Sequence, residues 1–289
     1  MSERNHGGVG SSGNTPINAE VHALKIAVEV ASAWYKGRGI DGPEVALGTV
    51  ATIATAGLLV DRPERLAAGM KSATPEGFVD IARQVWAATI MRRPDVAQWV
   101  HPLLYWLFTD IGARGREQVK RTADAALNAG QLELTDTERR FDCDLLGPVL
   151  GALRSRTETR VNAQMYTPGD IASALIAVTL GDLKPGQTFC DDTVGTGGLF
   201  RVAAQVVRSR GVDPADMLWF GADVDELAVA ATAVNGLIWG LGPRVFLHVG
   251  EILADPNWAD KASRRRAVFL GQIERLNAGM AALDFLKNL

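Results

Sequence analysis

A glycine-rich loop is the first feature of this sequence that is suited to chemistry. Residues 191–198 read DDTVGTGG and follow a short apolar run that ends at Cys190. Gly195 and Gly197 allow the backbone to take positive φ angles, so that bare amides can lie against a ligand. A helix starting near Gly198 adds unpaired N–H groups that favour a carboxylate or a phosphate. A plain tight turn is the alternative, and the loop alone leaves both interpretations open.

Acidic residues follow the next two strand-like runs. GADVD at 221–225 places Asp223 where a carboxylate can accept from both hydroxyls of a ribose. Asp225 opens the next helical pattern, so we expect it to cap that helix. Glu251, in GEIL, could accept from an adenine amine, and a solvated surface charge is its alternative. Together these strand ends predict a nucleotide-like cofactor at one edge of a sheet.

The elements that must position these residues are short strands alternating with helices. Strand-like runs lie at 188–192, 217–224, 244–252 and 267–271, and helical patterns at 197–211 and 225–242 separate the first three. This alternation predicts a parallel wound sheet, with the ligand near the point where strand order reverses. One amphipathic helix follows the last run, so we expect the sheet to be truncated after its fourth strand.

The chain before this sheet is expected to be helical. Residues 1–16 are rich in Gly, Ser and Asn and predict a disordered tail, and residues 17–156 predict a helical domain. Residues 157–289 would form the second domain, beginning with a connector and a Pro-started helix at 166–183. The helical patterns of the first domain lie at 17–37, 43–60, 74–93, 94–115, 116–130 and 138–156.

Composition limits the possible functions. The chain has 289 residues, 47% of them hydrophobic, and a formal net charge of −3, so contact with DNA must come from a local patch or a partner. No apolar run is long enough for a membrane span and no signal peptide is evident, which predicts a cytoplasmic protein. Two cysteines suit a reducing compartment, and the four scattered histidines predict no metal site.

The stretch from about Phe141 to Leu253 resembles the modification subunit of type I restriction–modification systems, a family of adenine-N6 DNA methyltransferases. The fold that this resemblance implies is α + α/β, an N-terminal helical domain followed by a shortened Rossmann-like methyltransferase sheet. The segments that match the family in order and approximate spacing are DLLG at 144–147, YTP at 166–168, DDTVGTGG at 191–198, GADVD at 221–225, VN at 234–235 and GEIL at 250–253.

The resemblance implies S-adenosylmethionine as the cofactor and assigns roles to single residues. Thr167 would meet the cofactor's carboxylate, with Tyr166 and Pro168 shaping the entrance. Asp191 would lie near the methionine amino group, and the loop residues Gly195, Thr196 and Gly197 would pass beneath the cofactor. Asp223 would bind the ribose hydroxyls, and Glu251 would bind the adenine amine. The chain departs from the family at 192–194, where Asp-Thr-Val replaces Pro-Ala-Cys.

The catalytic motif of that family is missing from the sequence. The family holds the flipped adenine with Asn-Pro-Pro and an aromatic residue after the fourth strand, and no such tetrapeptide occurs here. Gln272 follows the expected fourth strand and could replace one amide acceptor. DPNW at 255–258 supplies Asp255 and Trp258 as a displaced catalytic loop, although we interpret it as the turn before the fourth strand.

Three functions are consistent with these features. The first is a protein that binds S-adenosylmethionine and acts on DNA, alone or with a partner subunit. The second is a catalytically inactive regulatory module that keeps the cofactor site, and the third is a helical interaction protein. The apolar stripe of the final helix, 272–289, predicts a homo-oligomer or a contact with a specificity-type subunit. The alternative is that this helix covers the edge of its own sheet.

Overall fold

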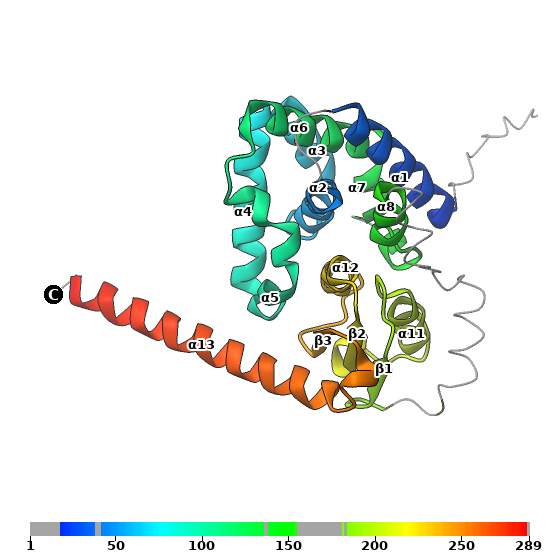
Figure 1. Ribbon diagram of the computed structural model, residues 1–289, viewed down its shortest axis with the longest axis vertical. Coiled ribbons are helices and arrows are strands. Elements are labelled where there is room, and N and C mark those ends of the chain that lie inside the picture. Colours follow the sequence, from blue (N-terminus) through cyan, green and yellow to red (C-terminus); the bar gives the residue numbers. More distant parts are fainter. Residues whose placement is uncertain (1–17, 38–41, 136–137, 155–180, 182–183, 288–289) are drawn as a thin grey trace, which may run out of the picture.

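The computed structural model describes residues 18–37, 42–135, 138–154, 181 and 184–287 (Figure 1). Helices form the part before residue 154, and a small sheet with its own helices forms the part after residue 184. The described residues of the first part contain no strand. Its helices are α1 (Ala19–Lys36), α2 (Pro43–Gly57), α3 (Pro63–Ser72), α4 (Pro75–Arg92), α5 (Ala97–Val100), α6 (Gly112–Asn128), α7 (Gln131–Thr135) and α8 (Leu146–Leu153).

Three details of the helical part differ from the sequence prediction. The helix expected at 138–156 is divided into the 3₁₀ turn η4 (Glu138–Phe141) and α8. Residues 94–115 were expected to form one helix, but Pro102 lies inside this segment and has no N–H to donate. The segment instead forms α5, the start of α6 and the short 3₁₀ turns η1 (Pro94–Val96), η2 (His101–Leu103) and η3 (Tyr105–Leu107). Helix α3 was not predicted, because Met70 is its single buried residue and its apolar periodicity is weak.

Helix α2 is the centre of the helical part, since its side chains from Val45 to Gly57 are all buried. Its buried threonines are compatible with this position because each hydroxyl donates to the carbonyl four residues earlier. Thr52 Oγ1, for example, donates to the Gly48 carbonyl at 2.7 Å and accepts from Trp86 Nε1 at 2.9 Å. The core around α2 therefore contains polar atoms with their hydrogen bonds made.

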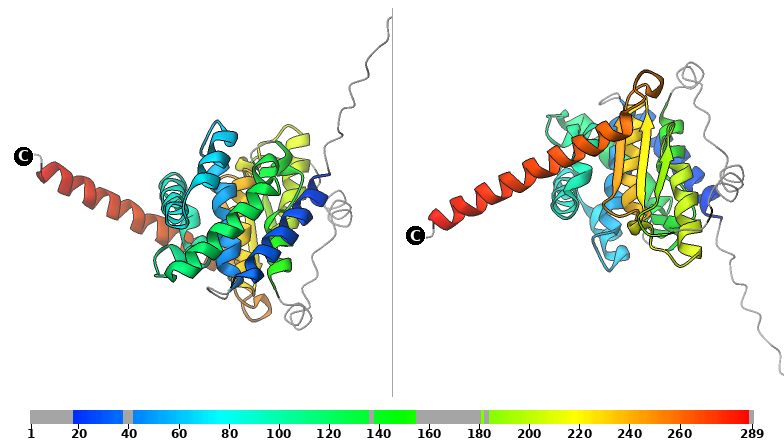
Figure 2. Two further views of the ribbon diagram at one scale, coloured as in Figure 1. Left: turned by 90° about the horizontal axis from the view of Figure 1, so that it is seen from above. Right: turned by 90° about the horizontal axis from the view of Figure 1, so that it is seen from below.

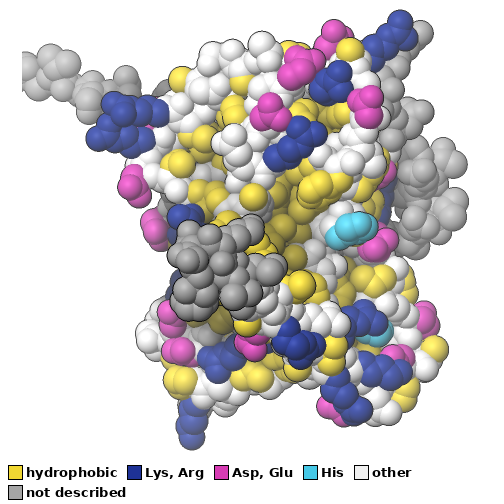
Figure 3. Space-filling model, turned by 90° about the vertical axis from the view of Figure 1, so that its left-hand side faces the viewer, with side chains coloured by type: hydrophobic (Ala, Val, Ile, Leu, Met, Phe, Trp, Pro, Cys, Tyr) yellow, Lys and Arg dark blue, Asp and Glu magenta, His cyan; other side chains and the backbone are white. Residues whose placement is uncertain are grey.

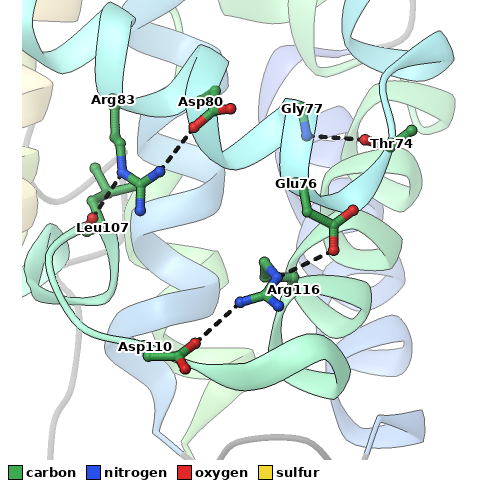
Figure 4. Close-up of polar contacts among 8 residues, drawn as sticks. All are labelled: Thr74, Glu76, Gly77, Asp80, Arg83, Leu107, Asp110 and Arg116. Atoms are coloured by element: carbon green, nitrogen blue, oxygen red, sulfur yellow. Dashed lines mark hydrogen bonds and ion pairs between the residues drawn. The ribbon is translucent and has the colours of Figure 1, made fainter.

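Polar side chains fix the outer helices relative to one another (Figure 4). Arg116 of α6 donates to Glu76 of α4 at 3.2 Å and to Asp110 at 3.1 Å. Arg83 of α4 donates to the carbonyl of Leu107 at 2.9 Å. The two ion pairs of Arg116 are exposed, so they orient the helices more than they stabilise them.

The predicted alternation of strands and helices is confirmed for three strands. The parallel sheet has the order β1 (Thr188–Asp191), β2 (Leu218–Asp223) and β3 (Val245–Val249). Helices α11 (Gly198–Ser209) and α12 (Glu226–Ile238) connect the strands. The expected reversal of strand order does not occur among the described strands.

The predicted fourth strand at 267–271 is wrong. These residues lie inside α13, a helix from Trp258 to Lys287. A short apolar run such as AVFLG does not distinguish a strand from a helix, and Gly271 at its end is tolerated within a helix. Figure 2 shows that α13 starts against the sheet and extends away from the rest of the molecule.

The two faces of the sheet are covered differently. Phe189, Phe200 and Trp219 form one aromatic group, with ring centroids 5.4–5.7 Å apart, on the face that meets α11 and α12. Helix α12 also contacts α2, α5 and α8, so the helical part and the sheet share one core. On the other face a small cluster formed by Ala222, Trp258 and Ala262 holds the first turns of α13.

The part of α13 from Gln272 to Ala281 is exposed, apart from a half-buried Ile273. Leu276 and Met280, which belong to its predicted apolar stripe, are exposed. This part of the helix therefore does not cover the edge of the sheet. None of the helices among the described residues combines the length and hydropathy needed to cross a membrane.

Gly48 of α2 is expected to resist substitution. A Cβ atom there would lie 2.1 Å from the Leu103 carbonyl oxygen. We expect Gly48→Ala to lower the free energy of unfolding by about 1–3 kcal/mol, because this overlap outweighs a gain in helix propensity of about 1 kcal/mol. The matched variant Gly69→Ala, in α3 with no atom within 4 Å of the added Cβ, should raise it by about 0.5–1 kcal/mol. Denaturant unfolding measures both, and equal changes would contradict the prediction.

Candidate functional site

The carboxyl ends of the strands bring the predicted acidic residues to one edge of the sheet. Asp191 is the last residue of β1 and Asp223 the last residue of β2, while Glu251 follows β3 after one glycine. Asp191 is in register with Gly221, two residues before Asp223. The strand pairing therefore places the two aspartates on the same, helix-facing side of the sheet. We call this edge, with the loop 192–198, the strand-end rim.

The glycine loop between β1 and α11 has two different kinds of glycine. Gly195 has a φ of +54°, and a Cβ atom added to it would meet nothing within 4 Å, so its backbone borders open space. Gly197 has a φ of +91°, and its Cβ would lie 2.9 Å from the ring of Trp239. Gly195 can therefore approach a ligand, whereas Gly197 is required for packing against α12.

Asp223 holds this loop in place. Its Oδ2 accepts from the Gly195 amide at 2.8 Å, and its Oδ1 accepts from the Asp225 amide at 2.9 Å. Asp225 caps α12 by accepting from the Leu227 amide at 3.1 Å, as the sequence predicted, and it also forms an ion pair with Arg154. The Asp223 carboxylate is partly exposed and keeps lone pairs for further donors.

Asp191 is a buried carboxylate surrounded by negative charge. It is 7% exposed, and its Oδ1 accepts from the Thr193 amide at 3.1 Å. Burial raises the pKa of the Asp191 carboxyl above its usual range, and the charges of Asp192 and Asp223 raise it further. Within the part of the chain that the structure describes, no Lys or Arg forms an ion pair with these three aspartates. The rim therefore favours a positively charged ligand.

The remaining predicted binding residues have varied positions. Glu251 is exposed and accepts from the Leu253 amide at 3.1 Å, at the start of the 3₁₀ turn η6 (Ile252–Ala254). Thr196 is 1% exposed, and its hydroxyl donates to Asp144 rather than facing the rim. Tyr166, Thr167 and Pro168 lie outside the described residues.

Two of the three catalytic candidates, Asp255 and Trp258, lie near the rim but are engaged in other contacts. The Trp258 indole donates to Asp192 at 3.0 Å, so DPNW does approach the glycine loop. However, the ring of Trp258 is 5% exposed and packs against the sheet, which leaves no face for a base. Asp255 pairs with Lys261 at 2.7 Å. Gln272 lies in α13, exposed and beyond the turns that contact the sheet, because the strand expected before it does not form.

Several contacts around the rim were not foreseen from the sequence. Thr232 of α12 donates to the Gly195 carbonyl at 2.7 Å, and Asn235 donates to the Thr196 carbonyl at 2.8 Å. The resemblance had marked Asn235 and Asp144 as parts of motifs without giving them a role. Polar residues on an otherwise apolar helix such as α12 are the signal that could have identified these contacts.

A separate groove lies in the helical part. It has a volume of about 510 Å³ and a mainly apolar lining. Helices α3, α6 and α7 form it, far from the strand ends in Figure 1. Its lining residues are Pro63, Glu64, Ala67, Ala68, Lys71, Leu127, Gly130, Leu132 and Glu133.

The part of the chain that forms this site is similar in sequence to known proteins. Residues 145–268 match the protein family described as N-6 DNA Methylase. This match covers less than half of the chain. A curated protein of Methanocaldococcus jannaschii, the "Type I restriction enzyme MjaIX methylase subunit", is 27% identical over 106 residues. The resemblance seen in the sequence is thereby confirmed.

The similarity covers only part of each protein. The stretch aligned with the archaeal methylase subunit spans 37% of this chain and 17% of that protein. The crystal structure of a type I restriction–modification methyltransferase subunit from Streptococcus thermophilus matches with a TM-score of 0.47 and 16% identity. That match covers 82% of this chain and 59% of the other, and its score is too low to establish a common fold.

The negative charge of the rim is expected to suppress the reactivity of Cys190. Burial and the neighbouring carboxylates of Asp191 and Asp192 raise the pKa of this thiol to about 11. Because the thiolate is the reactive form, labelling of Cys190 should accelerate about tenfold per pH unit up to about pH 10. Asp192→Asn should raise the rate at a fixed pH.

Labelling of a Cys143→Ser variant with a thiol reagent isolates Cys190. The Cys143 thiol is 3% exposed with a pKa raised to about 12, so the native chain should also label at one site only. A labelling rate that levels off near pH 9, the ordinary pKa of a thiol, would contradict the predicted rise in the pKa of Cys190.

Proposed function

We propose that this protein binds S-adenosylmethionine at the strand-end rim and serves as a module of an adenine-N6 DNA methyltransferase. The observation that carries the proposal is the group of acidic side chains beside the open Gly195 backbone, with no ion-pair partner in the described residues. The cofactor is a cation at its sulfonium and its amino group, so its charge matches this environment. The family match of residues 145–268 supports the same cofactor and a Rossmann-like methyltransferase sheet.

The residues present fit the cofactor. Asp191 would accept from the methionine amino group. The attraction between these two charges is strengthened because the carboxylate is already removed from water. Asp223 would accept from the ribose hydroxyls with the lone pairs that its two backbone contacts leave free. Gly195 would lie beneath the cofactor, and Glu251 would reach the adenine amine. We also propose Tyr166, Thr167 and Pro168 as the cover of the methionine end.

The chemistry divides between the cofactor and the protein. The cofactor, when bound, supplies an activated methyl group. The protein must hold an extruded adenine so that its amine lies in line with that group, and it must accept the amine's protons. Among the described residues near the rim, Trp258 and Asp255 are held by contacts within the chain. We therefore propose that a partner completes the site for the base.

DNA contact is also expected to involve a partner. The archaeal relative is named as a methylase subunit, which is a part of a larger enzyme. On the face drawn in Figure 3, Lys and Arg side chains are mixed with Asp and Glu, without a wide area of positive charge. With a net charge of −3, this chain has no general attraction to a phosphate backbone. The cytoplasm, where DNA and cofactor are both present, is the proposed location.

A regulatory module that binds the cofactor without transferring its methyl group is the second candidate. It is favoured by α13, which occupies residues 258–287 where the sequence predicted a turn, a fourth strand and a final helix. The two candidates share the cofactor site and differ in methyl transfer, so one assay separates them.

Cofactor binding is expected to depend on Asp223. Calorimetry with S-adenosylmethionine should show binding to the native chain, and Asp223→Ala should weaken it by about ten- to a hundredfold, the effect of losing a charged acceptor worth about 1.5–3 kcal/mol. Asp216→Asn, at the opposite end of β2, is the matched control and should bind normally. No heat and no thermal shift with millimolar cofactor would refute the proposal.

Methyl transfer by this chain alone is expected to be very slow. Loss of in-line positioning and of polar contacts to the amine typically lowers a rate about a thousandfold or more. Incubation with tritiated cofactor and mixed-sequence duplex DNA measures it. Strong labelling of adenine that depends on the protein would contradict this prediction, and Asp255→Ala and Trp258→Ala would then test DPNW as the catalytic loop.

A further inference from the structure

Two motifs of the family resemblance, DLLG and VN, meet behind the glycine loop. Asp144 lies in the turn that leads into α8, and Asn235 lies in α12. Thr196, between the two loop glycines, donates its hydroxyl to Asp144 Oδ2 at 2.5 Å. Asn235 Nδ2 donates to Asp144 Oδ1 at 2.9 Å. Residues distant in sequence therefore converge on one carboxylate.

Further hydrogen bonds connect this carboxylate, Thr196 and Asn235 to one another and to Gly147. The Gly147 amide also donates to Asp144 Oδ1, at 3.0 Å. Asn235 Nδ2 makes a second contact, to the Thr196 carbonyl, at 2.8 Å. Thr196 and Asn235 are each 1% exposed, so water does not compete for these contacts. Thr196 is thus held through both its side chain and its backbone.

Close packing around Asp144 and Thr196 restricts the movement of their side chains. A Cβ atom at Gly147 would lie 2.4 Å from Asp144 Oδ2 and 2.7 Å from Thr196 Oγ1. Trp239, which packs against Gly197, donates to the Cys143 carbonyl at 3.2 Å. The segment 143–147 therefore supports the loop from behind by direct contact.

The side-chain and backbone groups that contact Asp144 are all able to donate hydrogen bonds. Burial raises the pKa of this carboxyl above its usual range, and the hydrogen bonds from Thr196, Gly147 and Asn235 and the charge of Arg201 oppose that rise. An ionised carboxylate only accepts hydrogen bonds, and each of its three partners is able to donate. An amide at this position could keep its oxygen towards Gly147 and Asn235, but it would replace the charged acceptor of the Thr196 hydroxyl with a neutral N–H donor, so the contact with Thr196 would be weaker.

We propose that Asp144 is a positioning residue for the cofactor loop. It holds Thr196 and thereby fixes the Gly195–Gly197 backbone on which S-adenosylmethionine would lie, without touching the cofactor itself. The inference rests on the proposed function, since it assigns a role towards the same site. It also couples cofactor affinity to the helical part of the protein, because α8 is attached at its other end through the Arg154–Asp225 ion pair.

Hydrogen exchange of the free, full-length chain tests the loop without any cofactor. Asp144→Asn and Thr196→Val should each speed exchange of the amides at 193–198 about tenfold or more, while the β2 amides keep their protection. Thr196→Ser keeps the hydroxyl and should behave as the native chain. Asp142→Asn is the matched control, because Asp142 is exposed and contacts Gln205 at 3.3 Å instead of the loop.

Calorimetry on the same variants tests the link to the cofactor. Asp144→Asn and Thr196→Val should weaken binding of S-adenosylmethionine about tenfold, and Thr196→Ser and Asp142→Asn should bind as the native chain. If the native chain binds no cofactor, the proposed function fails, and the exchange experiment still decides whether Asp144 fixes the loop.

Two results would overturn the inference. One is native-like exchange at 193–198 in both Asp144→Asn and Thr196→Val. The other is faster exchange throughout the sheet with unchanged cofactor affinity, which would show a purely structural role. If Asp144→Asn does not fold, Thr196→Val decides alone, because it removes one hydroxyl and keeps the shape of the side chain.

Discussion

The arrangement of the strand-end rim depends on Asp223. Its carboxylate accepts from the amides of Gly195 and Asp225, and its backbone carbonyl accepts from the Gly250 amide at 2.9 Å. The loops after β1, β2 and β3 are therefore all bound to one residue. Backbone amides beyond the ends of parallel strands have no ladder partner, and a carboxylate that only accepts is well suited to satisfy them. The same residue is the proposed ribose acceptor, so the shape of the site and its affinity have a common origin.

Much of the sheet could be predicted because its signals are local. The strands β1 to β3 are short apolar runs bounded by turn residues, and Asp225 precedes a helical pattern at a typical cap position. The error at 267–271 arose where this local signal is ambiguous. That run is apolar and free of proline, and only its surroundings select helix: the first turns of α13 bury Trp258 and Ala262 against β2 and β3.

From the sequence, only those features of the site that follow from the topology of a parallel sheet could be predicted. Parallel strands bring Asp191, Asp223 and Glu251 to one edge, and the sequence is sufficient for that inference. The contacts of Asp144 with Thr196 and Asn235 join positions 52 and 91 residues apart, and no local pattern encodes them. The inward direction of Thr196 could not be foreseen for the same reason. Family motifs identified these residues, but the structure supplies the physical reason for their presence.

The length of α13 has a consequence of its own. Between Gln272 and Ala281 every side chain except Ile273 is exposed, so this stretch is supported by its backbone hydrogen bonds and not by packing. The turns anchored at Trp258 already form a helical nucleus, so this stretch does not bear the cost of nucleation. Each further residue that joins the helix gains one hydrogen bond and loses the conformational entropy of its backbone. We expect the helical length of such a stretch to vary with temperature and solvent. An apolar surface bound along the exposed side chains of Leu276 and Met280 would stabilise the whole stretch as helix.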